Sequence, residues 1–403
     1  MLINVDDPGK KPYPGMPLLQ LGFRPFFLLA GISAVLLIFI WGWILSTGAS
    51  VTIYSSIDWH GHEMVYGFVV AVVAGFLLTA VKNWTGRQTA NGTALLFLAL
   101  LWLTARVLPF LPEVFPYWIL ATIDLSFLPV LAATLFPLLM KSRNYRNLVF
   151  PAILMILFAA NAVFHLGVMG FIEDGQRYAV YAAVYIVLLL ISIMGGRVIP
   201  FFIERGLGGE IQCRTYSTIE IAANAVLLLL GALHTTGLTG IFSVIVALIA
   251  AVLHLIRLAG WYSNGVWRVP LLRVLVLAYG WIVVGLFLLA LSMAGIIAVS
   301  LALHALTIGG IGLMTMGMMV RVSMGHSGRK LFAPALIPAA FAALNVAVVV
   351  RVILPIMIST QSYPALVLIS ALIWVVVFGI FVYKMSSVYL SPRVDGRPGS
   401  LLP

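Results

Sequence analysis

The sequence predicts an all-α, polytopic membrane protein with twelve transmembrane helices and both termini in the cytoplasm. Three observations lead to this prediction: the composition, the length of the apolar runs and the placement of the basic residues. Of the 403 residues, 63% are apolar and only 9% are charged, whereas soluble domains carry about 25% charged residues. Such a chain cannot cover a water-facing surface, which excludes a soluble globular protein. Disorder is also excluded, because disordered chains are poor in apolar residues.

Twelve apolar runs are long enough to cross a bilayer, because a transmembrane helix needs about 20 predominantly apolar residues. In chain order they are 26–47, 62–81, 92–109, 116–139, 148–170, 178–198, 217–237, 240–257, 270–292, 296–320, 332–354 and 364–384. The connections are short and contain turn residues, as in Thr85-Gly86 and Ser263-Asn264-Gly265. The longest, from Ile199 to Tyr216, is too short to fold independently. We therefore expect a single twelve-helix transmembrane domain over residues 1–403.

Lysine and arginine are distributed unevenly between the two predicted faces of the membrane. Twenty of the 23 lie on one face, namely Lys10, Lys11, Arg24, Lys82, Arg87, Lys141, Arg143, Arg146, Arg197, Arg205, Arg214, Arg257, Arg268, Arg273, Arg321, Arg329, Lys330, Lys384, Arg393 and Arg397. Only Arg106, Arg177 and Arg351 lie on the other. Because cytoplasmic loops carry an excess of basic residues, the larger set marks the cytoplasmic face. The net charge of +11 then reflects topology and contact with anionic lipid, and no nucleic-acid partner is expected.

Five of the seven histidines fall in the predicted outer leaflet or at the outer surface: His60, His62, His165, His234 and His304. Ionisable groups in a membrane are costly and are functional by default, and imidazole ligates haem iron and copper. For His234, and for His254 near the cytoplasmic face, a hydrogen bond within helix packing is the simpler interpretation. His326, in a Gly-Ser loop, is expected to be solvated.

The run His60-Gly61-His62-Glu63 places two imidazoles and a carboxylate within one turn at the start of the second span. On a helix, His60 and Glu63 share a face, and His62 points about 200° away from His60. This span end could serve two neighbouring sites. Alternatively, His62 ligates one centre and Glu63 tunes it, since a carboxylate beside an imidazole orients it or relays protons.

The second and tenth spans share a spacing pattern that suggests an internal repeat. After His62, glycine occurs at +5 and +13, and Thr85-Gly86-Arg87 follows at +23 to +25; after His304, glycine occurs at +5 and +13, and Ser327-Gly328-Arg329 follows at +23 to +25. Shared packing demands are one explanation, because membrane helices are rich in glycine. A true repeat places His62 and His304 at equal depth. They could then hold a haem from both faces, or set haem and copper side by side.

Other polar residues lie near the same predicted layer. Asn161 and His165 share a face of the fifth span, four residues apart. Arg106 and Arg351 end spans on the outer side, where a guanidinium either pairs with haem propionates or anchors the helix at the interface. Asp124 lies about two turns into the fourth span, where an unpaired carboxylate is costly.

Several motifs together resemble the signature of the NnrS family. They are Gly22-Phe23-Arg24-Pro25-Phe26-Phe27, Trp59-His60-Gly61-His62-Glu63-Met64, the run from Ala74 to Gly86, Ala160-Asn161-Ala162-Val163-Phe164-His165-Leu166, Gly195-Gly196-Arg197-Val198-Ile199-Pro200-Phe201-Phe202, and the stretch from His304 to Arg329. The resemblance implies a twelve-span protein of the bacterial inner membrane that carries haem and copper and belongs to the nitric oxide response. The chain departs from the family pattern at Val276, where members often carry histidine. Either this protein lacks that ligand or His254 replaces it.

We therefore predict a haem b and copper protein that handles nitric oxide in defence against nitrosative stress. Any haem is non-covalently bound, because Cys213 is the sole cysteine, which excludes covalent attachment through Cys-x-x-Cys-His. The predicted metal ligands are His60, His62, His165 and His304; the predicted haem-binding residues are His62, His304, Arg106 and Arg351; and the predicted proton-transferring residue is Glu63. Nitric oxide and an unidentified electron donor are the expected partners, alongside the lipid bilayer.

Whether the protein turns nitric oxide over is left open by the sequence. One interpretation is a nitric oxide reductase-like oxidoreductase, in which Glu63 supplies protons. A second is a non-enzymatic nitric oxide sensor or haem reservoir. A third is a twelve-span secondary transporter, because internal similarity is common in transporters. The loop Asn83-Trp84-Thr85-Gly86-Arg87 differs, however, from the Asp-Arg-Gly-Arg loop of the major facilitator group.

Overall fold

The structure is a computed structural model that describes residues 15–50, 52–111, 114–209, 211–238, 240–358 and 360–396. Within these residues all regular structure is helical, and twelve helices are long and apolar enough to cross a membrane. The predicted number of spans is therefore confirmed. Lys10, Lys11 and Arg397, which belong to the basic set, lie outside the described residues. The cytoplasmic placement of the termini stays a prediction.

Several helices are longer than the apolar runs that predicted them. The sixth span was expected at 178–198, but its helix is α7, Gly175–Gly206. The second, expected at 62–81, occupies Ser56–Thr85. Apolar runs end at the first charged residues, whereas residues such as Arg197 and Arg205 are good helix formers. The helices therefore continue beyond the apolar stretch.

The chain divides into two compact units. Unit 1 comprises Met1–Gln176, Met319–Phe332 and Phe378–Pro403, and unit 2 comprises Arg177–Met318 and Ala333–Val377. The continuous helices α7, α12 (Leu313–His326) and α15 (Tyr363–Leu390) run from one unit into the other. The expectation of a single domain over residues 1–403 stays a prediction.

Unit 1 contains the first five spans. Their helices are α1 (Phe23–Thr47), α2 (Ser56–His62), η2 (Glu63–Val69), α3 (Val70–Thr85), α4 (Gly92–Val107), α5 (Tyr117–Lys141) and α6 (Val149–Val168). The span formed by α2, η2 and α3 is the most deeply buried of the twelve described spans. It packs against α1 and α5, while α5 also packs against α4 and α6. Polar side chains on this central span therefore face protein rather than lipid.

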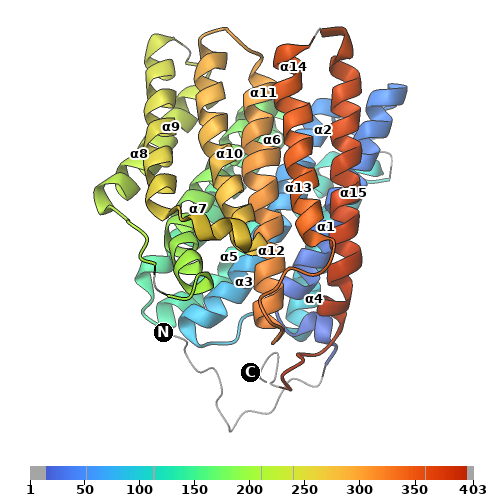
Figure 1. Ribbon diagram of the computed structural model, residues 1–403. Coiled ribbons are helices and arrows are strands. Elements are labelled where there is room, and N and C mark those ends of the chain that lie inside the picture. The colour runs from blue at the N-terminus through green and yellow to red at the C-terminus, as the bar shows by residue number, and fades with distance from the viewer. Residues whose placement is uncertain are drawn as a thin grey trace. The chain divides into compact units, whose positions relative to one another are not determined.

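Unit 2 contains the remaining spans. Besides most of α7, its helices are α8 (Ser217–Thr235), α9 (Ile241–Trp261), α10 (Pro270–Met293), α11 (Val299–His304), η6 (Ala305–Gly312), α13 (Ile337–Val348), η7 (Val349–Ile353) and α14 (Leu354–Met357), with the first parts of α12 and α15. Figure 1 shows α8 beside α9 and α9 beside α10, in agreement with their packing. η6 packs against both α10 and α13, and η7 packs against α11.

Among the described residues, three spans contain a π-helical segment. Such wide turns are rare overall, but they occur frequently at functional sites. η2 begins directly after His62, and η6 begins directly after His304. A left-handed glycine follows each of these spans, Gly86 (φ 66°) directly after Thr85 and Gly328 (φ 75°) two residues after His326. The two segments that share a sequence spacing thus also share a local backbone. The third π segment, η7, contains Arg351.

Candidate metal centre

Six buried polar side chains meet inside unit 1, contributed by four different spans. They are His62 at the end of α2, Glu63 at the start of η2, Arg106 on α4, Asp124 on α5, and Asn161 and His165 on α6. Each is at most 7% exposed. Buried polar groups are costly unless they are paired, so the contacts among these side chains decide what this site can hold.

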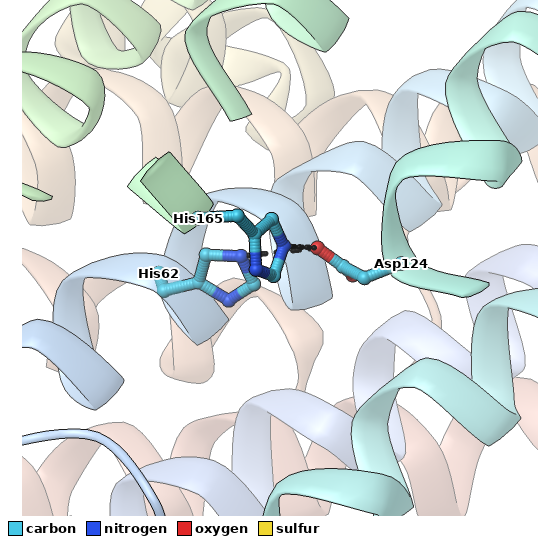
Figure 2. Close-up of side chains that lie close together, drawn as sticks. All are labelled: His62, Asp124 and His165. Carbon is cyan, nitrogen blue, oxygen red and sulfur yellow. Dashed lines mark hydrogen bonds and ion pairs between the residues drawn. The ribbon is translucent and has the colours of Figure 1, made fainter. Parts of the chain in front are cut away.

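Three of the six could hold a metal ion. His62, Asp124 and His165 each offer one ligand atom, and these atoms lie within 4.8 Å of one another. His62 Nε2 is 3.2 Å and His165 Nε2 is 3.0 Å from the same carboxylate oxygen, Asp124 Oδ2. Figure 2 shows the two rings and the carboxylate pointing toward one another. Two imidazoles and one carboxylate are a donor set suited to copper, zinc or non-haem iron.

The remaining residues hold these three in place. His62 Nδ1 lies 3.1 Å from Glu63 Oε1, and His165 Nδ1 lies 2.7 Å from the hydroxyl of Tyr117. Metal-ligating histidines commonly engage their second ring nitrogen with a carboxylate or another polar group, which fixes the ring. Both candidate ligands therefore have an outer partner of the kind expected in a metal site.

Arg106 links the two carboxylates of the group. Its NH1 donates to Glu63 Oε1 at 2.8 Å, and its NH2 donates to Asp124 Oδ1. The side chain of Arg106 was predicted to pair with haem propionates. Both of its terminal nitrogens donate to acidic side chains of this site. The propionate role of Arg106 stays a prediction.

The contacts of His62 require an additional positive charge. Its Nε2 faces Asn161 Oδ1 at 3.0 Å, and this amide is oriented with Nδ2 donating to Asp124 at 2.6 Å. Its Nδ1 faces the Glu63 carboxylate. Both ring nitrogens therefore face acceptors, which a neutral imidazole with a single N–H cannot satisfy. A proton on His62 or on Glu63, or a cation at His62 Nε2, would satisfy these contacts.

The charges of the group lead to the same requirement. Glu63 and Asp124 contribute two negative charges, and Arg106 contributes one positive charge. Uncompensated charge is very unfavourable inside a protein. In addition, Glu63 Oε2 is buried and has no hydrogen-bond partner. A metal ion or one further proton would bring the group to neutrality, so the residues present fit a bound cation.

Aromatic rings separate this group from water. The rings of Phe164, Tyr66 and Tyr54 lie 4.4, 4.9 and 5.7 Å from that of His62, measured between centroids. Tyr54 precedes the second span, and burial raises its pKa well above the usual value. The phenol is therefore neutral at physiological pH. Such an environment strengthens electrostatic interactions within the site.

His60 lies apart from the other predicted ligands in unit 1. Its ring stacks on Trp41 of α1, with centroids 4.4 Å apart and planes inclined by 17°. It thus points away from His62, as the helical spacing predicted. The group of potential ligand atoms found in the described part of the chain contains His62 and His165 but not His60.

In unit 2, His304 and Arg351 have features that fit a haem. His304 Nδ1 lies 2.6 Å from the carbonyl oxygen of Ser300, so Nδ1 carries the proton and Nε2 carries the lone pair. An axial haem ligand needs this form. Arg351 is 7% exposed, lies over the ring of Tyr363 at 5.2 Å, and its NH1 is buried without a hydrogen-bond partner. A carboxylate such as a propionate would satisfy it.

The other histidines have protein partners. His234 Nδ1 contacts the Tyr185 hydroxyl at 2.9 Å, and His254 Nδ1 contacts that of Tyr279 at 2.7 Å. These hydrogen bonds fit the packing interpretation of both residues. The expectation for His326 is wrong. It is the last residue of α12 and half-buried, with Nε2 3.3 Å from Asn83 Nδ2, because the helix extends beyond the apolar run.

Three residues at the site were not predicted as members. Asp124 was noted only as a costly carboxylate, Asn161 was noted only as sharing a face with His165, and Tyr117 was not noted. The depth of Asp124 was the available signal, since its span offers few polar side chains at that level. Tyr117 begins α5, and tyrosine at a span end is ordinarily an interfacial anchor. Nothing in its position distinguishes it from such an anchor.

The fold and this site define an integral membrane protein of twelve spans with a candidate metal centre inside a helical unit. The chain belongs to the NnrS family, because the family model described as NnrS protein matches residues 17–393. The resemblance predicted from the motifs is therefore confirmed. A comparison with curated proteins found no match.

Proposed function

We propose that this protein is a haem b and copper protein of a bacterial inner membrane that binds nitric oxide and reduces it. Membership of the NnrS family supports a role in the nitric oxide response. The observation that carries the proposal is the His62–Asp124–His165 group, whose contacts require an additional positive charge. Nitric oxide is small and uncharged, so it can reach such a site from the lipid phase.

Copper is the metal that we assign to unit 1. His62 Nε2, His165 Nε2 and an oxygen of Asp124 would hold it, and imidazole ligands suit copper. Copper held there would supply a binding site for nitric oxide and one-electron redox chemistry. Glu63 and Tyr117 orient the two imidazoles, and Arg106 holds both carboxylates. Phe164 and Tyr66 keep bulk water from the ligands.

Haem b is assigned to unit 2, where His304 would ligate the iron and Arg351 would pair with a propionate. Non-covalent haem supplies high affinity for nitric oxide in its ferrous state. The lone pair on His304 Nε2 is directed by the hydrogen bond from Nδ1 to Ser300. The π segment that follows, η6, lengthens the backbone turn at this position.

Glu63 is the residue to which we assign proton storage for the reaction. Reduction of two nitric oxide molecules consumes two electrons and two protons and yields one nitrous oxide and one water. The Oε1 atom of Glu63 contacts both His62 and Arg106, while Oε2 has no partner. The second oxygen can therefore carry a proton close to the ligands. The electrons come from a separate donor protein or quinol.

An anaerobic titration of the purified, reduced protein with nitric oxide tests this proposal. We expect a Soret band that shifts on addition of nitric oxide, and nitrous oxide when an electron donor is supplied. A shifted Soret band without nitrous oxide would indicate a sensor or haem reservoir and contradict reduction. A colourless preparation from haem-sufficient cells would contradict the haem assignment and favour a transporter.

A further inference from the structure

A second set of charges, partly buried, lies at the opposite end of unit 1, which the basic residues predict to be cytoplasmic. Four basic side chains form what we call the basic cluster: Arg24, Lys82, Arg329 and Arg393. They come from the start of α1, the end of α3, the residues after α12 and those after α15. The metal centre uses none of them.

Contacts between side chains and backbone join these four chain segments. Asn83 of α3 contacts His326 of α12 at 3.3 Å, and the ring of His326 lies 6.2 Å from that of Phe23 at the start of α1. After α15 the chain returns to the end of α12, where the Val394 amide donates to the Ser327 carbonyl at 3.1 Å. The four segments thus form one packed region.

Arg24 is the innermost member of the basic cluster and is 1% exposed. Its NH1 donates to the carbonyl oxygens of Tyr389 at 2.9 Å and Ser391 at 2.5 Å, so it caps the C-terminal end of α15. Its NH2 is buried without a hydrogen-bond partner. A buried guanidinium nitrogen without an acceptor is unfavourable, and this one lies where the positive charges of Arg329 and Arg393 act on it.

Arg329 has the same deficiency. Its NH1 is buried and has no hydrogen-bond partner. Arg329 follows Gly328, which has a left-handed backbone. The carboxyl group of Asp395 lies close to this glycine, because a Cβ at Gly328 would be 2.6 Å from the Asp395 carboxyl carbon. Asp395 in turn receives the Nε and NH2 groups of Arg393, at 3.0 and 2.5 Å. The acid is thus held by Arg393, while donors on Arg24 and Arg329 remain unsatisfied.

In the part of the chain that the structure describes, positive charge predominates in this region: four cationic side chains accompany the carboxylate of Asp395, which accepts from Arg393. The buried NH2 of Arg24 and the buried NH1 of Arg329 lack an acceptor. An anionic group such as a phosphate would supply oxygen acceptors for both nitrogens.

We propose that the basic cluster binds a phosphate group, carried either by an anionic phospholipid or by free phosphate, with Arg24 NH2 and Arg329 NH1 as donors. Guanidinium groups bind phosphate oxygens through paired, charge-assisted hydrogen bonds. Basic sites between transmembrane helices on the cytoplasmic side bind anionic headgroups. The ligand would hold together the ends of α1, α12 and α15.

The test uses purified full-length protein and two matched variants. Arg329→Gln removes an unsatisfied donor and Arg87→Gln removes an exposed arginine after α3, so both lower the net charge by one. In one arm, native mass spectrometry measures phosphatidylglycerol retained during delipidation, with phosphatidylcholine as the neutral lipid. In the other arm, thermal unfolding is followed with inorganic phosphate or with chloride at equal ionic strength. Near-wild-type thermal unfolding without ligand shows that each variant is folded.

We expect Arg329→Gln to weaken binding of phosphatidylglycerol or phosphate about five-fold or more, and Arg87→Gln to change it less than two-fold. Loss in the lipid arm alone assigns the site to a phospholipid. Loss in the phosphate arm alone assigns it to free phosphate. Equal binding by wild type and both variants, or equal loss in both variants, would overturn the proposal. If Arg329→Gln does not fold, Arg329→Lys replaces it, because lysine keeps the charge and loses the paired donors.

Discussion

Asp124 is the residue on which the candidate metal centre depends most. Its Oδ2 atom is approached by both imidazoles and by the amide of Asn161, while Oδ1 accepts from Arg106. Through hydrogen bonds and ion pairs it contacts four of the other five side chains of the group, whereas His62 contacts three in this way. Substitutions around it therefore separate three contributions: the metal ligands, the proton site and the charge balance.

Glu63→Gln tests the proton site. Because the amide keeps the size of the side chain and Glu63 is not a proposed ligand, we expect the variant to retain haem and copper. Its nitric oxide consumption, measured with an electrode and an artificial electron donor, should fall to background. Glu173→Gln, an exposed acid, is the control and should leave consumption unchanged. Wild-type consumption by Glu63→Gln would remove Glu63 from the mechanism.

Arg106→Gln tests the charge balance. The substitution leaves two buried carboxylates without their shared cation, and breaking a buried ion pair in this way costs about 3–5 kcal/mol. We expect a clearly lower midpoint of thermal unfolding, measured in detergent for protein loaded with the same metal content. The unfolding midpoint of Arg106→Lys should lie between those of wild type and Arg106→Gln, because lysine keeps the positive charge but lacks the bidentate donor geometry of the guanidinium group.

The control for this pair is Arg177→Gln, at an exposed arginine on the same predicted face. It should unfold near the wild-type midpoint. If Arg106→Gln behaved like Arg177→Gln, the ion pairs of Arg106 with Glu63 and Asp124 would contribute little to stability.

At the scale of the elements, Gly67 within the π segment η2 leaves space for the Glu63 side chain in the site. Glu63 begins η2 and Gly67 lies within it. A Cβ at Gly67 would lie 2.9 Å from Glu63 Oε2 and 3.3 Å from the Leu37 side chain. The glycine therefore leaves room for the carboxylate beside His62. The glycine at +13, Gly75, instead faces the ring of Phe27, at 2.8 Å from such a Cβ.

Gly67→Ala and Gly75→Ala should consequently have different effects. Gly67→Ala displaces the flexible end of Glu63, so we expect reduced nitric oxide consumption with near-wild-type stability. Gly75→Ala forces a methyl group against a packed ring, which costs about 1–3 kcal/mol, and should lower stability while consumption per folded molecule is kept. Thermal unfolding and consumption measured on the same preparations separate the two. Equal effects on both quantities would show that η2 has no particular role in placing Glu63.

The sequence predicts how deep a residue lies along its own span far better than it predicts which residues of other spans it contacts. Composition and run length were sufficient for twelve spans, and spacing placed His62 and His165 at similar depth. Spacing also identified the His62 and His304 segments, which share an α–π–α backbone. It could not identify Asp124 as the common partner of both imidazoles. That contact depends on which face of α5 packs against α6, and the apolar residues of these helices are similar on all sides.

At the scale of the whole molecule, unit 1 carries buried charge at both of its ends. The contacts of the metal centre call for a further positive charge, and two guanidinium nitrogens of the basic cluster lack an acceptor. Both groups contain side chains from several spans. Their contacts therefore link helices that apolar packing alone would hold together weakly in a membrane. We infer that bound ligands of opposite sign contribute to the stability of this unit.

The most direct test of the central claim is the copper content per chain of wild type, His165→Ala and His60→Ala after identical loading and desalting. We predict one copper in unit 1 that is lost from His165→Ala and retained by His60→Ala, whose ring stacks on Trp41. Haem content, which we assign to His304, should be the same in all three proteins. Equal copper in wild type and His165→Ala, or loss of copper only in His60→Ala, would contradict the assignment of the His62–Asp124–His165 group as the metal centre.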